Sequence, residues 1–290
     1  MNKTIYMTYK KNVPEIVFER WKNLNPDYNI EFSLDEECVD FLEQNFNVYV
    51  AELFKKIPEG MYKADLWRLC KLYIHGGIYA DVDLVPYIDI NTLDKNNTFY
   101  SCLSINKDTI FQAFMANFSK PKNSLILQFL ISFLLNYPIG SSIPALGPTR
   151  DIYSCIKYNL DEIDLDSEKV YEINNIKIKV NIGSSETNVK HVDLHYFPDN
   201  IEYTINFNKS SYKDSFDAKI ENNILKIIRI DEPSGWNHSH SLNICIKSAE
   251  KVFLFQEKTE NEDWRKAYVE LNNKKILDSR DYNYLINKGW

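Results

Sequence analysis

Two aspartates, Asp81 and Asp83, stand two positions apart within a short apolar run, Ile78 to Val85. The alternation of this run predicts a β-strand, on which residues i and i+2 point to the same face. Tyr79 and the two aspartates would then share one face, while the apolar residues between them face the core. Two carboxylates about 7 Å apart on one strand repel each other unless a positive charge lies nearby. A divalent cation, Mg²⁺ or Mn²⁺, that also binds phosphate oxygens meets this need.

The segment before this strand predicts a helix, Tyr62 to His75, that carries a second charged pair. Its apolar residues follow the i, i+3, i+4, i+7 spacing, and Gly76-Gly77 predict its end. Asp65 and Arg68 are at i and i+3, so they lie on one side of the helix, beside the apolar stripe. We therefore expect this pair near the rim of the sheet. There Arg68 reaches phosphate or sugar hydroxyls, and Asp65 reaches a pair of hydroxyls.

The surrounding N-terminal half supplies the elements of an α/β sheet, because it begins strand, helix, strand, helix. These first elements are predicted at Thr4–Tyr9, Pro14–Lys22, Tyr28–Phe32 and Asp35–Phe46. Beyond the aspartate strand we expect a strand at Thr98–Ile105, followed by helices at Ile110–Phe118, Ser124–Tyr137 and Thr149–Asn159.

The character of the sequence changes after about residue 165. Helical periodicity is scarce, and short β-prone runs recur between turn residues at 177–180, 202–206, 224–230, 242–246 and 252–255. Residues 261–271 predict a return to helix. We therefore expect a core domain at 1–197, a β-rich lobe at 198–258 and a helical segment at 259–290.

The bulk composition excludes several classes of protein. With 290 residues, 44% hydrophobic, the chain can bury a large core. A net charge of −7 argues against nucleic-acid binding through the overall field. Five cysteines without a C-x-x-C pair argue against a disulfide framework and favour a reducing, cytoplasmic setting. The N-terminus lacks the apolar core of a signal peptide, and Ser124–Tyr137 is too short for a transmembrane segment.

The residues around both charged pairs resemble a known enzyme family. Family 32 glycosyltransferases, and the related glucosyltransferase domain of large clostridial toxins, share a pattern that this sequence matches in type and spacing at Ala64, Asp65, Arg68, Gly76, Gly77, Tyr79, Asp81 and Asp83. The resemblance covers roughly residues 1–160, and further similar positions are Trp21, Asn25-Pro26 and Gly147-Pro148.

This resemblance implies a GT-A (Rossmann-like) nucleotide-sugar-binding domain followed by the β-rich C-terminal lobe. It also implies transfer of a sugar from a UDP- or GDP-sugar to a glycan acceptor, with retention of configuration and with Mn²⁺ or Mg²⁺. Asp83 is then the direct metal ligand, and Asp81 contacts the ribose and a metal-bound water. Asp65 and Arg68 hold the donor sugar.

Further site residues follow from the same resemblance. Thr8 and Tyr9, at the end of the strand that lines the nucleotide base, are expected to contact the donor, as is Tyr79. The family carries a C-terminal histidine segment that completes the metal or phosphate site. The candidates are His191, His195, His238 and His240, of which His238 and His240, next to Trp236, fit best.

Other interpretations stay open. Paired aspartates also serve nucleotidyltransferases, which release pyrophosphate, but that class does not account for the Asp65–Arg68 helix. A non-catalytic glycan-binding protein would use the β-rich lobe, and its binding would survive the loss of Asp83. The plainest alternative is structural, because Asp81 and Asp83 could line a solvated strand face and Asp65 could form an ordinary helical ion pair.

Overall fold

A computed structural model of the chain describes residues 2–136, apart from 47 and 107, and residues 250–278, apart from 262. Between these stretches it describes a few helical residues within 149–156 and the backbones of strands β7–β13. The chain divides into two compact units. Unit 1 comprises Met1–Leu42, Pro58–Asn123 and Glu250–Trp290, and unit 2 comprises Glu43–Ile57 and Ser124–Ala249. The domain boundaries at 197 and 258 stay a prediction, because compactness alone does not show where independent folding units begin.

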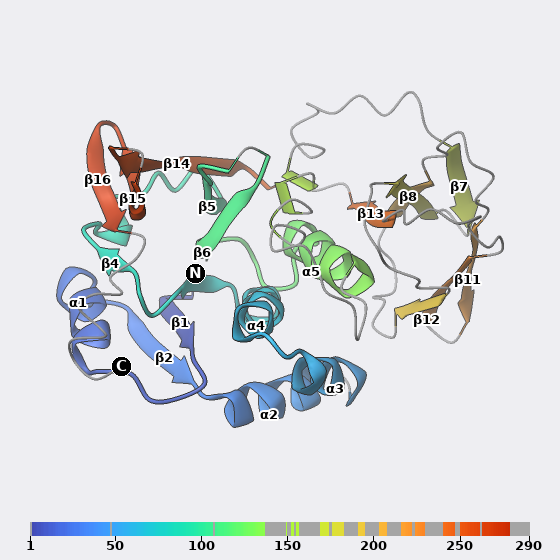
Figure 1. Cartoon of the computed structure of the whole chain (residues 1–290), viewed down its shortest axis with the longest axis horizontal. Helices are drawn as coiled ribbons and strands as arrows, with labels where there is room; N and C mark the ends of the chain where they lie inside the picture. The colour runs from blue at the N-terminus through green and yellow to red at the C-terminus, as the bar shows by residue number, and fades with distance from the viewer. Residues whose placement is uncertain are drawn as a thin grey trace. The chain divides into compact units, whose positions relative to one another are not determined.

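Unit 1 is built on a nine-stranded mixed sheet in the order β2-β1-β3-β6-β5-β14-β15-β16-β4 (Figure 1). The strands are β1 Thr4–Thr8, β2 Asn29–Ser33, β3 Gly77–Ala80, β4 Val85–Pro86, β5 Phe99–Leu103, β6 Ile110–Asn117, β14 Val252–Glu260, β15 Asp263–Leu271 and β16 Lys274–Asp278. Strand β1 pairs in parallel with β2 and β3, and β14 in parallel with β5, while β6 is antiparallel to both β3 and β5. The ends of β1, β3, β5 and β14 therefore meet the start of β6 at one edge of the sheet, called here the carboxyl edge.

Helices packed against this sheet confirm the predicted α/β class. They are α1 Ile16–Leu24, α2 Asp35–Asn45 and α4 Gly60–His75, all close to the predicted ranges. Helix α4 ends as its glycines predicted, since Gly76 has φ +64° and Gly77 has φ +88°. A short 3₁₀ helix, η1 Ile90–Thr92, follows β4.

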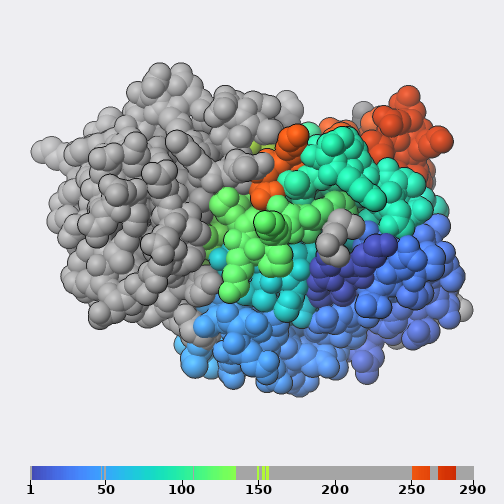
Figure 2. All heavy atoms as spheres, turned by 180° about the vertical axis from the view of Figure 1, so that it is seen from behind, coloured from blue at the N-terminus to red at the C-terminus, as the bar shows by residue number. Residues whose placement is uncertain are grey.

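The core of unit 1 joins segments from both ends of the chain. Trp21 of α1 stacks on Phe114 of β6 with ring centres 6.2 Å apart, and Phe114 packs against Phe255 of β14 at the same distance. All three rings are essentially unexposed. Because burying one large apolar side chain stabilises a fold by about 1.5–3 kcal/mol, β14 contributes strongly to unit 1. The space-filling view shows the orange and red atoms of the C-terminal strands directly against the teal atoms of residues near 80–110 (Figure 2).

Three predictions of secondary structure are wrong. The strand predicted over 78–85 stops at Ala80, because Asp81 begins a turn in which the Leu84 amide donates to the Asp81 carbonyl at 3.2 Å. The predicted helix at 110–118 is strand β6, and the predicted helix at 261–271 is strand β15. In the second case the turn residues Asn272 and Asn273 both have positive φ, as a tight hairpin turn requires. This hairpin pairs β15 with β16 and overrides the helical pattern.

In unit 2 the structure describes helices α3 Val48–Lys56 and α5 Ser124–Asn136, the helical residues within 149–156, and the strands of the predicted β-rich region. These strands are β7 Lys169–Ile173, β8 Ile176–Ile182, β9 His191–Leu194, β10 Tyr203–Phe207, β11 Phe216–Glu221, β12 Ile224–Arg229 and β13 His240–Ile246. Four of them close into a small barrel, and β11, β12 and β9 form a separate sheet. The predicted β-prone runs are therefore confirmed as strands, although the last of them, 252–255, belongs to β14 of unit 1 rather than to the β-rich region. The helix predicted at 149–159 falls mostly outside the described residues. Among the helices that the structure describes, none combines the length and apolar character of a membrane span.

Candidate active site

Helix α4 and strand β3 bring the two charged pairs together at the carboxyl edge. A guanidinium nitrogen of Arg68, Nη2, lies 3.1 Å from Asp65 Oδ1 and 3.5 Å from Asp81 Oδ1. The Tyr79 hydroxyl donates to the same Asp81 oxygen at 2.6 Å. The predicted rim position of the helical pair needs one refinement, because Asp65 and Arg68 are only 8% and 3% exposed. They form the floor of the site rather than its surface.

Arg68 is held on every side by groups that fix the direction of its guanidinium. Its Nε donates to the Ala64 carbonyl at 3.1 Å, and its Nη1 donates to the carbonyl of Gln112 on β6. The guanidinium carbon lies 4.3 Å from the centre of the Tyr79 ring, a cation–π contact. This planar fork of donors is therefore positioned before any ligand arrives.

Burial sets the protonation of the residues on this floor. Desolvation raises the pKa of Asp65 to about 6, although Arg68 opposes the shift. Burial disfavours the charged form of Arg68, but Tyr79 and the surrounding aspartates hold its pKa above the ordinary value, so it remains a cation. Burial also raises the pKa of Tyr79 well above its ordinary value, so this hydroxyl keeps its proton and donates to Asp81.

Asp81 and Asp83 lie in the turn that joins β3 to β4. The Asp81 amide donates to the Ala113 carbonyl at 2.8 Å, which continues the β3–β6 pairing by one residue. Although the strand has ended, Val82 and Leu84 remain buried as predicted, while both aspartates are partly exposed. The carboxylates therefore reach solvent at the carboxyl edge, above the buried Arg68.

The residues of this turn fit a divalent cation in part. All described polar contacts of the Asp81 side chain go to Oδ1, which leaves Oδ2 for a ligand. Oxygen ligands suit Mg²⁺ and Mn²⁺, which often keep few protein carboxylates when phosphate supplies the rest. Within the described part of the chain, no group of three or more acidic, histidine or cysteine side chains forms a metal site. A cation held here would need ligands beyond the described carboxylates of this turn.

The other predicted site residues are placed as follows. Thr8 ends β1, and its hydroxyl donates to the Ser33 carbonyl at 2.8 Å and lies 3.2 Å from the Cys38 sulfur. Tyr9 continues the parallel pairing with β2 and is partly buried. His238 lies outside the described residues, and His240 begins β13 in unit 2. The structure therefore brings together Asp65, Arg68, Tyr79, Asp81 and Asp83, and the roles of the other four stay predictions.

Gln112 is a site residue that the sequence did not indicate. It is 4% exposed and lies on β6 next to Ala113, which accepts the Asp81 amide. Neither its side-chain nitrogen nor its side-chain oxygen has a hydrogen-bond partner among the described residues. A buried amide left without partners costs stability unless a ligand or water completes it. The wrong helix prediction at 110–118 hid this residue, since only a strand places Gln112 beside the aspartate turn.

Comparison with known proteins supports the resemblance seen in the sequence. Residues 15–100 match the model of the family described as "glycosyltransferase sugar-binding region containing DXD motif". This range contains Asp65, Arg68, Tyr79, Asp81 and Asp83, so the match confirms the predicted family resemblance for the segment that forms the site.

Named relatives each match 29% of the chain. An initiation-specific alpha-1,6-mannosyltransferase of Candida albicans is 31% identical over 93 residues, which covers 29% of this chain and 24% of that protein. Inositol phosphoceramide mannosyltransferase 3 of Schizosaccharomyces pombe is 26% identical over 99 residues, or 29% of this chain and 28% of that protein. The similarity thus spans about a quarter of each relative. Among solved structures, the PaToxG glycosyltransferase aligns with a TM-score of 0.42 at 17% identity, covering 55% of this chain and 69% of that chain.

Proposed function

We propose that this chain is a metal-dependent glycosyltransferase of the GT-A type. It moves a sugar from a UDP- or GDP-sugar to a glycan acceptor with retention of configuration. The observation that carries the proposal is the network at the end of β3, in which buried Arg68 lies between Asp65 and Asp81. The family match over residues 15–100 supports the same activity. Two relatives are named mannosyltransferases, so mannose-carrying donors belong among the first to test.

The donor would bind with its diphosphate over the aspartate turn. Asp83 and Asp81 hold Mn²⁺ or Mg²⁺, which would neutralise charge on the departing diphosphate as a Lewis acid. Arg68 and Asp65 orient the sugar, because a fixed guanidinium and a buried carboxyl group offer a donor and an acceptor to neighbouring hydroxyls. The side-chain amide of Gln112, which is buried and has no partner among the described residues, is a further candidate donor and acceptor.

Positioning carries most of the proposed rate enhancement. Arg68 is already fixed by the carbonyls of Ala64 and Gln112 and by the Tyr79 ring, so little reorganisation is needed when charge develops. Tyr79 keeps Asp81 oriented through its hydroxyl. Retention fits attack on the same face of the sugar, since no carboxylate nucleophile can be named from the described residues.

The two rival functions are separated by their products. A nucleotidyltransferase would release pyrophosphate from a nucleoside triphosphate, and a glycan-binding protein would release nothing. The network of Asp65, Arg68 and Asp81 favours transfer, because it places a sugar-orienting pair directly beside the paired aspartates.

The test is release of nucleoside diphosphate from a panel of UDP- and GDP-sugars, with Mn²⁺ and with chelator. We expect slow hydrolysis of one donor by the wild type and a loss of at least about 100-fold in Asp83→Asn, as for removal of a group that stabilises developing charge. Asp94→Asn, which makes the same charge change at an exposed turn, is the matched control and should retain activity. Equal turnover in Asp83→Asn and wild type would contradict the proposal.

A further inference from the structure

Asp83 lies outside any strand, so its position depends on what holds the chain on either side of the turn. On the preceding side, β3 is fixed between β1 and β6. On the following side, the chain enters β4, which has only two residues and is the last strand of the sheet. A two-residue edge strand cannot fix the turn alone, because few hydrogen bonds hold it.

The C-terminal strand β16 supplies the missing support. Leu277 pairs with Pro86 and Asp278 with Val85, and the Tyr87 amide donates to the Ile276 carbonyl at 2.8 Å. The Tyr87 hydroxyl also donates to Asp278 Oδ2 at 2.6 Å. Leu277 is 0% exposed, so β16 is anchored in the core rather than laid on the surface. In Figure 1, β4 lies beneath the hairpin of β15 and β16.

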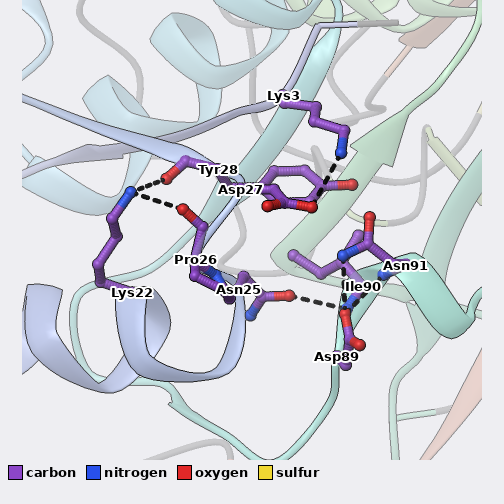
Figure 3. A network of polar contacts seen from close by, with 9 residues as sticks. All are labelled: Lys3, Lys22, Asn25, Pro26, Asp27, Tyr28, Asp89, Ile90 and Asn91. Carbon is purple, nitrogen blue, oxygen red and sulfur yellow. Dashed lines mark hydrogen bonds and ion pairs between the residues drawn. The ribbon is translucent and has the colours of Figure 1, made fainter.

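Asn25 holds the next residues from the opposite side. Its side-chain amide donates to the Ile88 carbonyl at 3.3 Å. The Ile90 amide donates to the side-chain oxygen of Asn25 at 2.8 Å (Figure 3). Asn25 is fully buried, and Lys22 fixes its neighbours by donating to the carbonyls of Pro26 and Tyr28 at 2.9 Å. The chain is therefore held from Val85 to Ile90, first by β16 and then by Asn25.

We infer that the C-terminal hairpin of β15 and β16 positions the aspartate turn for metal binding. This inference rests on the proposed function and adds a positioning element to it, nearly 200 residues beyond Asp83 in the sequence. Loss of the β4–β16 pairing would let Asp83 move away from the carboxylate of Asp81, which Tyr79 and Arg68 hold in place. The hairpin acts through the backbone of Val85 to Tyr87 and touches no substrate.

The experiment measures Mn²⁺ affinity by the electron paramagnetic resonance signal of free Mn²⁺, alone and with UDP or GDP. Leu277→Ala removes the core anchor of β16. Leu42→Ala is the matched control, because it makes the same substitution at a residue that is also 0% exposed but lies on α2, outside the sheet that contains β4 and β16. Both variants are compared at a temperature where circular dichroism shows them folded. We expect Leu277→Ala to weaken Mn²⁺ binding about tenfold, as loss of support behind a metal ligand does, and Leu42→Ala to change it less than about twofold.

A second variant tests the same inference without removing a buried core side chain, so that it is not expected to unfold the protein. Tyr87→Phe removes only the hydroxyl that reaches Asp278 from a half-exposed residue, and we expect about a threefold weaker Mn²⁺ affinity, as for one lost hydrogen bond. If wild type binds Mn²⁺ while Leu277→Ala and Tyr87→Phe bind it equally well, the inference is wrong and the proposed function stands. If wild type does not bind Mn²⁺ with or without nucleotide, the proposed function fails and the inference fails with it.

Discussion

Asp65 is a buried carboxyl group beside a permanent cation, and its folded pKa of about 6 is above its ordinary value of 3.8. The desolvation that raises this pKa outweighs the attraction of Arg68. The fold is therefore more stable with this carboxyl group protonated than with it ionised. A raised pKa at a buried carboxyl group beside charged partners is typical of functional sites, which favours a role in ligand binding.

The Asp65 shift predicts how stability depends on pH. Between about pH 4 and 6 the folded protein keeps a proton that the unfolded chain has released, so stability falls as pH rises through this window. In metal-free protein, we expect the unfolding free energy of wild type to fall by about 2 kcal/mol more than that of Asp65→Asn between pH 4 and 7. Urea unfolding at several pH values measures this difference. Parallel curves for the two proteins would show that Asp65 does not carry the shift.

At the scale of elements, α4, the glycine pair and β3 form one rigid unit. A side chain on Gly77 would place its Cβ 2.9 Å from the Thr4 carbonyl oxygen and 3.0 Å from the Tyr6 ring. Gly77 also has φ +88°, which other residues rarely adopt. Gly77 therefore allows β3 to begin directly after α4. As a result, the Arg68 guanidinium on α4 lies over the Tyr79 ring on β3.

This close approach predicts that any side chain at Gly77 lowers the stability of the fold. Gly77→Ala should destabilise the protein by about 1–3 kcal/mol, through backbone strain and the clash with β1. Gly60→Ala, at the start of the same helix, meets nothing within 4 Å and should change stability by less than about 0.5 kcal/mol. Thermal and urea unfolding of both variants test this contrast, and equal effects at the two glycines would contradict it.

The sequence predicted elements whose signals are local and missed those whose signals are not. The stripe of α4 and its glycine stop are local, so Asp65, Arg68 and the two aspartates were found together. The run from Ile110 to Ala116 is apolar apart from Gln112, and such a run fits a buried strand or a buried helix equally well. Its strand character comes from pairing with β3 and β5, and Gln112 became visible only through that pairing.

At the scale of the whole molecule, unit 1 is assembled from three separated stretches of chain. Strand β14 pairs with β5, and β16 pairs with β4, although about 150 to 190 residues separate the partners. No periodicity reveals such long-range pairing, so the C-terminal residues were predicted to form a helical segment outside the core. Their place in the sheet makes unit 1 depend on residues that follow the β-rich region.

We propose that the turn after β3 forms a metal-dependent nucleotide site. Calorimetric titration of UDP and of GDP, each with Mn²⁺ and with chelator, tests it most directly. We predict that wild type binds one of the two nucleotides at least about tenfold more tightly with Mn²⁺, as a bridging cation requires, and that Asp83→Asn shows no such gain. Two results would contradict the account. In one, the folded wild type binds neither nucleotide. In the other, the nucleotide affinity is the same with and without Mn²⁺ and the same in wild type and Asp83→Asn.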